Sequence, residues 1–355
     1  MAMLGILGGG QLGRMLALAA GKLGLSVHIY APEPDSPAAA VAAAFTCAAY
    51  DDTDALLAFA QSVAAITYEF ENVPAATAEL LNAHAPVRPN PRALAVTQDR
   101  WHEKSFIRAQ DIATAPFYNI ESEADLGPAL AKIGPPAVLK TRRLGYDGKG
   151  QRLIRQGTDL AAAFDTFNRV PSILEGFVAF KRELSVIAAR GLDGQFAAYD
   201  PVENQHQDHV LHRSLAPAKL TPEQRDKALA IAAAILSALD YVGVMGIELF
   251  EAADGSLMVN ELAPRVHNSG HWTQDACTVS QFEQHVRAVM GWPLGSPERH
   301  SDAIMTNLLG EAAQGWDTRA LGPHTSLHLY GKDAPRPGRK MGHLTELKPK
   351  TSGHE

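Results

Sequence analysis

The sequence has little cysteine and no long apolar run, and both shortages restrict what kind of protein it can be. Only two cysteines, Cys47 and Cys277, occur among 355 residues, and they lie far apart. This excludes a disulfide framework and a cysteine-rich metal or iron–sulfur site, and it favours a reducing cytoplasm. The longest apolar run, residues 228–239, is too short to cross a bilayer. We also find no export signal at the N-terminus.

Positive charge is scarce over the chain as a whole. The sequence holds 32 Lys and Arg against 39 Asp and Glu, a net charge of −7. This balance disfavours non-specific binding to nucleic acid or to an anionic membrane, so neither partner is expected. Apolar residues at 46% are ordinary for a globular chain, and the length predicts about two or three domains.

Strand and helix signals alternate through the first 100 residues. A helix is expected over 12–23, and the short apolar strands fall at 3–7, 27–30 and 64–68. This βαβ pattern predicts a parallel sheet with helices on both faces. The Ala- and Pro-rich residues 31–49 are expected to form a surface connection.

After residue 97 the predicted helices and strands no longer alternate regularly. Two helices are expected, over 97–109 and 222–239. Strands are expected over 137–140, 172–175, 182–189 and 195–199, and a hairpin over 242–252 and 256–262.

The first predicted strand leads into a glycine loop. Residues 8–13 read Gly-Gly-Gly-Gln-Leu-Gly, which fits G-x-G-x-x-G, and Glu33 follows twenty residues after Gly13. Glycines admit an anion close to the backbone, and a helix N-terminus offers amide donors. A dinucleotide, another phosphate ligand and a simple tight turn all fit this pattern.

A second glycine loop is strongly basic. Residues 140–155 contain six Lys and Arg against one acid, Asp147, and three glycines fall within residues 145–150. A flexible cationic flap suits closure over a nucleoside triphosphate. The loop lacks the Walker A pattern, and an ordinary solvated loop is the alternative.

Two glutamates face each other in the predicted hairpin. If Asp254 and Gly255 form the centre of the turn, Glu248 pairs directly with Glu261. Two like charges so close are unfavourable unless a cation lies between them, and all-oxygen ligation favours Mg²⁺. Two solvent-facing glutamates are the alternative. Asn260 adds a neutral oxygen.

Three further groups of polar residues attract attention. Arg265 and His267 follow the hairpin and suit a small anionic substrate. The histidines at 206, 209 and 212 suggest zinc, but their spacing would not converge them on one ion, so we expect a polar nucleotide-site lining instead. Residues 332–343 form a basic tail that is either a surface loop or a phosphate-binding turn.

Taken together, these segments resemble the ATP-grasp ligases, and most specifically the N5-carboxyaminoimidazole ribonucleotide synthetase family. The resemblance covers nearly the whole chain. Its most specific string is Asn-Glu-Leu-Ala-Pro-Arg-Val-His-Asn-Ser-Gly-His-Trp-Thr at 260–273, and Arg-Pro-Gly-Arg-Lys-Met-Gly-His at 336–343 closes it. The implied fold is α/β: an N-terminal Rossmann-like parallel-sheet domain at 1–100, an ATP-grasp domain at 101–290 with a lid subdomain at about 105–175, and a C-terminal segment at 291–355.

The resemblance also implies roles for particular residues. Mg²⁺ would be held by Glu248 and Glu261. ATP would be bound by Arg100, Lys140, Gly145, Tyr146, Asp147, Gly148, Lys149, Gly150, Gln151, Glu175, Gly176, Phe177, Val178, Glu183, His206, Asn260 and Glu261. The ribonucleotide would meet Gly10, Gln11, Leu12, Glu69, Glu71, Lys332 and Arg339, with Glu69 and Glu71 left as alternatives. Catalysis would involve Tyr146, Asp147, Arg265, His267 and Lys332.

The implied reaction is ATP-dependent carboxylation of 5-aminoimidazole ribonucleotide with bicarbonate, through carboxyphosphate and CO₂. Asp147 or His267 would help to remove the proton, and the family implies a homodimer. Four alternatives stay open: a formate-using glycinamide ribonucleotide transformylase, a biotin carboxylase, an NAD-dependent dehydrogenase and a catalytically silent nucleotide-binding module.

Overall fold

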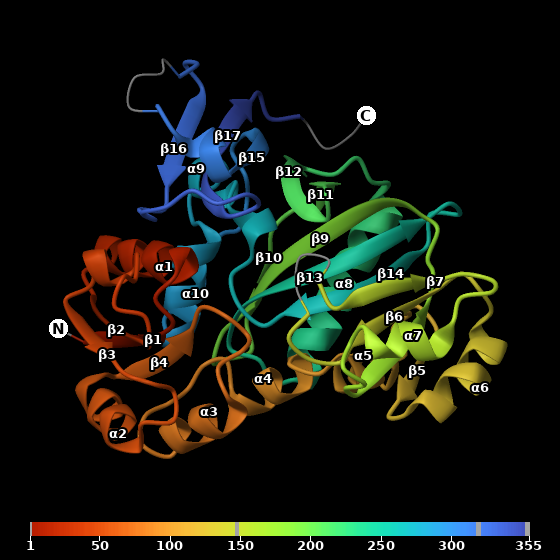
Figure 1. The fold of residues 1–355 in the computed structure, drawn as a ribbon. Coiled ribbons are helices and arrows are strands. Elements are labelled where there is room, and N and C mark those ends of the chain that lie inside the picture. Colours follow the sequence, from red (N-terminus) through yellow and green to blue (C-terminus); the bar gives the residue numbers. More distant parts are fainter. Residues whose placement is uncertain (1, 146–148, 317–320, 352–355) are drawn as a thin grey trace.

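The computed structural model describes residues 2–145, 149–316 and 321–351. Three sheets organise these residues (Figure 1). The first belongs to the N-terminal part, the second is a small antiparallel sheet, and the third is a large sheet that continues into the C-terminal strands.

The N-terminal sheet is parallel, in the order β3-β2-β1-β4. Its strands are β1 (Met3–Leu7), β2 (Ser26–Ala31), β3 (Ala44–Cys47) and β4 (Ala65–Tyr68), and its helices are α1 (Gln11–Lys22), α2 (Thr53–Ser62), α3 (Ala75–Asn82) and α4 (Pro91–Thr97), with the short turn η1 (Ala39–Val41). The predicted strands and the first helix are confirmed to within two residues. Helices cover both faces: α1 lies against one, and Leu56 and Phe59 of α2 pack on the other.

The expected surface connection at 31–49 is wrong, because it contains β3. Residues 44–47 pair with β2 in parallel register, and the half-buried Phe45 packs against the core. A four-residue edge strand in an alanine-rich segment carries no alternating apolar pattern, so β3 could not be predicted from the residue pattern.

The second sheet is antiparallel, in the order β5-β8-β6-β7. Its strands are β5 (Phe117–Ile120), β6 (Ala137–Thr141), β7 (Gln151–Ile154) and β8 (Ser172–Gly176), covered by α6 (Glu123–Ile133) and α7 (Leu160–Asp165). These elements share a small core of their own around Leu139, Phe164 and Leu174. We call this unit the lid.

The large sheet runs in the order β14-β13-β9-β11-β12-β15-β17-β16, with β10 beside β9. Its central strands are β9 (Phe180–Arg190), β10 (Phe196–Ala198), β11 (Val202–Gln207), β12 (Val210–Ala216), β13 (Gly243–Ala252) and β14 (Leu257–Ala263). Helices α5 (Arg100–Arg108), α8 (Pro222–Ala238), α9 (Thr273–Ala276) and α10 (Gln281–Val289) surround it, with the turn η2 (Asn268–Gly270). The predicted helix over 222–239 is confirmed.

The helix expected over 97–109 is confirmed as α5, but it begins at Arg100, because Thr97 is the last residue of α4. Asp99 separates the two helices, because its backbone is extended and its carboxylate accepts a 3.0 Å hydrogen bond from the Trp101 N–H as the N-cap of α5. The C-terminal strands β15 (Asp302–Leu309), β16 (Thr325–Leu329) and β17 (Lys340–Lys348), with the turn η3 (Gly310–Ala313), were not anticipated as part of the large sheet. They pair onto β12 and so continue it.

No helix within the described residues combines the length and apolarity that a membrane span requires.

Candidate active site

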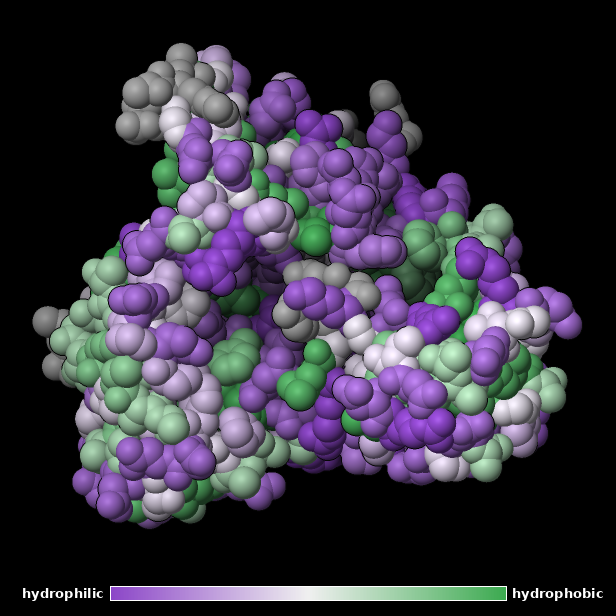
Figure 2. Space-filling model, viewed as in Figure 1, coloured by the Kyte–Doolittle hydropathy of each residue, from purple (hydrophilic) through white to green (hydrophobic). Residues whose placement is uncertain are grey.

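A cavity of about 790 Å³ lies where the three sheets meet. On the face drawn in Figure 2, the molecule is hollowed between its N-terminal part and the lid, and hydrophilic residues gather around this hollow. Of the predicted site residues, the cavity is lined by Gln11, Leu12, Glu69, Glu71, Arg100, Lys140, Gly145, Lys149, Gly150, Gln151, Phe177, Glu183, His206, Glu248, Asn260, Glu261, Arg265 and His267. One pocket therefore joins residues from all three sheets.

Other predicted residues lie elsewhere. Tyr146, Asp147 and Gly148 fall outside the described residues. Six described residues do not line the cavity: Gly10, Glu175, Gly176, Val178, Lys332 and Arg339. Several of these still contact residues that do.

The glutamates of the β13–β14 hairpin pair directly, Glu248 opposite Glu261, as predicted. The predicted two-residue turn is wrong, however. The backbones of Ala252 and Ser256 pair across a three-residue loop in which Gly255 has a φ of +81°. Continued without interruption, this register would pair Glu248 with Asn260. A β-bulge shifts the pairing by one residue, so that Glu248 pairs with Glu261 and the two side chains share one face of the sheet.

Each of these glutamates has a basic side chain beside it. Arg100 lies 3.1 Å from Glu261, and the Nε2 atom of His267 lies 3.2 Å from Glu248. Burial raises the pKa of Glu261, but Arg100 and Lys140 outweigh it and lower the pKa overall. Arg100 therefore already compensates the charge of Glu261, and the divalent cation expected between the two glutamates stays a prediction.

The hairpin still offers the oxygen donors that Mg²⁺ prefers. Glu248, Asn260 and Glu261 all line the cavity. The buried carboxamide of Asn268 lines it too, and neither its oxygen nor its nitrogen has a hydrogen-bond partner among the described residues. Two carboxylates and an unpartnered amide oxygen on one wall fit a hard divalent cation.

A buried charge network supports the wall next to the lid. Glu175 on β8 lies 2.9 Å from Lys140 on β6 and 3.6 Å from Lys104 on α5. Burial alone would raise the pKa of Glu175, but the two lysines lower it to about 2. Glu175 therefore holds Lys140 in place at the cavity rather than lining it. Beside this network, burial and Glu261 raise the pKa of Glu103.

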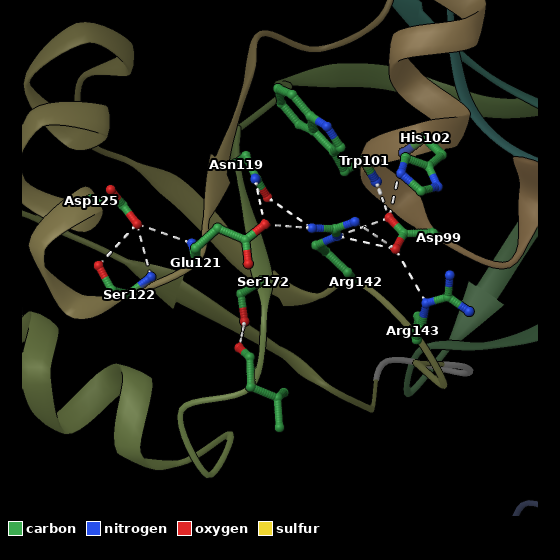
Figure 3. Close-up of polar contacts among 11 residues, drawn as sticks. Asp99, Trp101, His102, Asn119, Glu121, Ser122, Asp125, Arg142, Arg143 and Ser172 are labelled. Carbon is green, nitrogen blue, oxygen red and sulfur yellow. Dashed lines mark hydrogen bonds and ion pairs between the residues drawn. The ribbon is translucent and has the colours of Figure 1, made fainter.

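Part of the basic glycine loop is already neutralised. Arg142 donates two bonds of 2.8–2.9 Å to Asp99, whose side chain is almost fully buried, and another to Glu121, and Arg143 also reaches Asp99. Figure 3 shows Arg142 lying between these two acids. These acids therefore reduce the loop's excess positive charge, and through Asp99 the two arginines tie the lid to the N-cap of α5.

The first glycine loop surrounds an internal carboxylate. Glu69 is buried, and it accepts hydrogen bonds from the backbone N–H groups of Gly10 and Gly13, the latter at 2.6 Å. A Cβ atom on Gly10 would lie 2.5 Å from the Oε1 atom of Glu69. Burial raises the pKa of Glu69, and the two amides oppose this shift. The amides expected to face a ligand phosphate are therefore taken by the chain's own anion.

Glu71 and Arg265 form an ion pair across the cavity floor. Burial raises the pKa of Glu71, but Arg265 lowers it to about 2, so this carboxylate is ionised. The two acidic candidates thus differ: Glu69 braces the glycine loop, and Glu71 orients Arg265.

The C-terminal segment reaches the same region. Burial and the nearby Arg339 lower the pKa of Lys332 to about 8, and its ammonium donates to the Lys340 carbonyl at 2.8 Å. Arg339 is half-buried and donates to the Ala334 carbonyl. Lys340 itself lines the cavity.

Two neighbouring strands of the large sheet, β9 and β11, supply an acid–imidazole pair. The Nδ1 atom of His206 lies 3.2 Å from Glu183. Burial lowers the pKa of His206, but Glu183 outweighs it and raises the pKa overall. Within the described chain, the one group of three candidate metal ligands is Asp275, His328 and His343, not the histidines 206, 209 and 212.

Sequence reasoning missed several lining residues. Phe180 and Phe250 stack with ring centroids 4.6 Å apart on neighbouring strands, and Asn268 and Lys340 also line the cavity. His206 and His209 line it as well, in agreement with the polar lining expected of these histidines. The alternation of β13 could have placed Phe250 on the face of Glu248, since they lie two residues apart. The residues around Phe180 contained no pattern that would have predicted its place in the cavity wall.

Models of three known domains match the chain in succession. They are a ribonucleotide synthetase preATP-grasp domain at residues 1–98, an ATP-grasp domain at 105–282 and a phosphoribosylaminoimidazole carboxylase C-terminal domain at 303–352. Together they span most of the chain.

Individual relatives match over nearly their full length. The N5-carboxyaminoimidazole ribonucleotide synthase of Brucella melitensis is 49% identical, over 98% of this chain and 97% of its own. The crystal structure of the corresponding synthetase from Thermus thermophilus is 43% identical, with a TM-score of 0.91 over 98% of this chain and 94% of that one. The Aspergillus clavatus enzyme, solved with ADP and 5-aminoimidazole ribonucleotide, is 30% identical with a TM-score of 0.91, over 98% and 94%.

Proposed function

The chain belongs to the N5-carboxyaminoimidazole ribonucleotide synthase family of ATP-grasp ligases, and from this premise we propose how its own residues carry out the reaction. It catalyses the ATP-dependent carboxylation of 5-aminoimidazole ribonucleotide in purine biosynthesis. The residue assignment rests mainly on one observation. A single cavity is lined by the paired carboxylates of the hairpin, by Lys140, which the buried Glu175 holds, and by Arg265, which Glu71 orients.

ATP binds between the lid and the large sheet. Lys140, fixed by Glu175, and Arg100, fixed by Glu261, supply charge for the phosphates. We assign the phosphates also to the glycine loop at 145–151, and the nucleoside to the segment 175–178 with Glu183, His206 and Asn260. The stacked Phe180 and Phe250 add an apolar surface beside it.

Mg²⁺ is the cation that this site takes. Glu248 and Glu261 would hold it, with the carboxamide of Asn268 as a further oxygen ligand. Bound there, it would neutralise charge on the phosphates of ATP.

The ribonucleotide and bicarbonate occupy the side of the cavity next to the N-terminal sheet. Gln11 and Leu12 at the start of α1, with Lys332 and Arg339 from the C-terminal segment, receive the ribonucleotide, and Gly10 contributes through its bond to Glu69. Arg265, oriented by Glu71, and His267 receive bicarbonate.

The chemistry follows from the weakness of bicarbonate as an electrophile. A bicarbonate oxygen attacks the γ-phosphorus of ATP, ADP leaves, and carboxyphosphate forms. Carboxyphosphate breaks down to CO₂ and phosphate in the closed site, where water is excluded. The exocyclic amine of the ribonucleotide attacks CO₂ and loses a proton, and Tyr146 and Asp147 are candidates to assist.

Three wider assignments complete the proposal. The chain works as a homodimer in the cytoplasm, without nucleic-acid or membrane partners. Its domains are residues 1–100, 101–290 with the lid at about 105–175, and 291–355. The use of NAD is disfavoured because Glu69 already occupies the loop amides that would bind a pyrophosphate.

Substrate omission tests this function. Phosphate release is measured with all substrates and then with bicarbonate and the ribonucleotide left out in turn, and the product formed from ¹³C-bicarbonate is identified by carbon NMR. Turnover should depend on both, and the label should appear in an N-carboxylated ribonucleotide. Phosphate release that ignores either omission would refute the assignment, and phosphate release that instead requires added formate and glycinamide ribonucleotide would point to a transformylase.

A further inference from the structure

A chain of buried hydroxyl and amide groups runs from the large sheet to His267. Its members are Ser185 on β9, Asn204 on β11, Ser214 on β12 and Ser269 in η2, and each is at most 6% exposed. The strand register explains why they meet. Ser185 lies opposite Glu248, and Asn204 lies opposite Ser214, on the face that carries the paired glutamates.

The contacts form one continuous series. Ser214 Oγ lies 2.8 Å from the Asn204 Oδ1 atom, and Asn204 Nδ2 lies 3.0 Å from Ser185 Oγ. Ser185 Oγ lies 2.6 Å from Ser269 Oγ, which lies 2.8 Å from His267 Nδ1. The other ring nitrogen, Nε2, lies 3.2 Å from Glu248 in the cavity wall.

The direction of this series is set at its end by a group that can only donate. The backbone N–H of Ser269 points at the Nδ1 atom of His267 at 3.4 Å, so Nδ1 is an acceptor. The Ser269 hydroxyl then also donates to Nδ1 and accepts from Ser185. The Ser185 oxygen accepts from the Asn204 amide, whose oxygen accepts from Ser214. Every group is satisfied in this order.

Reversing the series would leave a conflict. If Nδ1 carried a proton, that proton would face the N–H of Ser269, which is also a donor. The hydroxyls of Ser269 and Ser185 would then have to donate away from the imidazole, and the Ser185 hydroxyl would point at the amide nitrogen of Asn204, a second donor. A buried donor facing a donor loses its hydrogen bond without gaining water.

We propose that Ser269, Ser185, Asn204 and Ser214 are positioning residues that fix His267 with its proton on Nε2, directed into the cavity. The assignment of a role to this proton rests on the proposed function. His267 then acts as a hydrogen-bond donor to the bicarbonate-derived oxygens, where negative charge gathers. In this form its Nε2 cannot accept the proton of the attacking amine, so that proton leaves by another group.

The tautomer can be measured directly. Protein labelled with ¹⁵N-histidine is recorded in two-bond ¹H–¹⁵N correlation spectra, and the signals of His267 are identified by their loss in His267→Gln. The wild-type spectrum should show the proton on Nε2. A proton on Nδ1 would overturn the proposal, and this result needs no positioning variant to fold.

Asn204→Asp tests the positioning role. A carboxylate at this position accepts only, so it should draw the Ser185 hydroxyl toward itself and reverse the series. The expected result is a proton on Nδ1 and a fall in kcat of roughly 10- to 100-fold, the size seen when groups that orient a histidine are removed, with the KM for ATP unchanged. An unchanged spectrum with wild-type kcat would refute the role.

Asn307→Asp is the matched control. Asn307 is also buried, on the nearby strand β15, and donates to the Leu211 carbonyl without contacting the series. Its variant should leave the His267 signals unchanged. If the wild-type chain lacked bicarbonate-dependent turnover, the proposed function would fail, whereas the tautomer measurement would still decide the inference.

Discussion

Removing the Glu175 carboxylate should make the protein less stable at neutral pH and remove part of its sensitivity to acid. In Glu175→Gln, the almost fully buried Lys104 loses the anion 3.6 Å away, and Lys140 loses the one at 2.9 Å. The pKa of Glu175 is lowered from 4.5 to about 2 in the folded chain. This lowering of the pKa corresponds to a folding free energy on the order of 3 kcal/mol.

The sign of the effect follows from the lowered pKa. The stabilisation is fully present above pH 4.5 and is lost as the pH falls through about 2. Urea unfolding at a series of pH values should therefore show a difference in unfolding free energy of about 3 kcal/mol between wild type and Glu175→Gln at pH 7, which narrows to about 1 kcal/mol at pH 3.

Two further variants make this test sharper. Lys104→Met in the Glu175→Gln background should recover part of the loss, because it removes a buried charge without a partner. Glu298→Gln, which breaks an exposed pair with Lys350, should leave the unfolding midpoint unchanged. A gap between wild type and Glu175→Gln that stays constant from pH 7 to pH 3 would refute the reasoning.

Three other predictions follow from the same structure. Gly10→Ala should lower the melting temperature and raise the KM for the ribonucleotide, because its Cβ would lie 2.5 Å from Glu69. Gly21→Ala, in the helix that Gly10 caps, has open space around it and should stabilise the protein by about 1 kcal/mol. Equal effects of the two substitutions would contradict this prediction. Glu248→Gln should reduce carboxylation by orders of magnitude while the circular dichroism spectrum stays unchanged, and substantial activity would remove Glu248 from the site. Iodoacetamide should modify the exposed Cys47 but spare the buried Cys277, whose pKa burial raises to about 12, so mass spectrometry should find one adduct before unfolding and two after.

The sequence predicted the chemistry of the site better than its supporting contacts. The pairing of Glu248 with Glu261 was correct, although the turn length behind it was wrong and a bulge compensated. The backbone conformation of the hairpin sets its turn length and its bulge. An Asp-Gly pair is compatible with more than one type of turn, so the sequence alone could not decide between them. The compensation of Glu261 by Arg100 required a tertiary contact between segments far apart in sequence.

The two glycine loops illustrate the same limit. Their composition indicated anion binding in both cases, but not which anion. In one loop Glu69, 59 residues from Gly10, is that anion, and in the other Asp99 takes up two of the arginines. An internal partner and an external ligand leave the same pattern in the sequence, so only the fold distinguishes them.

The continuation of the large sheet into β15, β17 and β16 has a consequence for truncated forms. A polypeptide ending near residue 300 would leave the backbone of β12 without the neighbour that β15 provides. Bare strand edges recruit other chains. Such a fragment should accumulate as aggregates rather than as a smaller enzyme, and during synthesis the nascent sheet would stay incomplete until its last strands emerge from the ribosome.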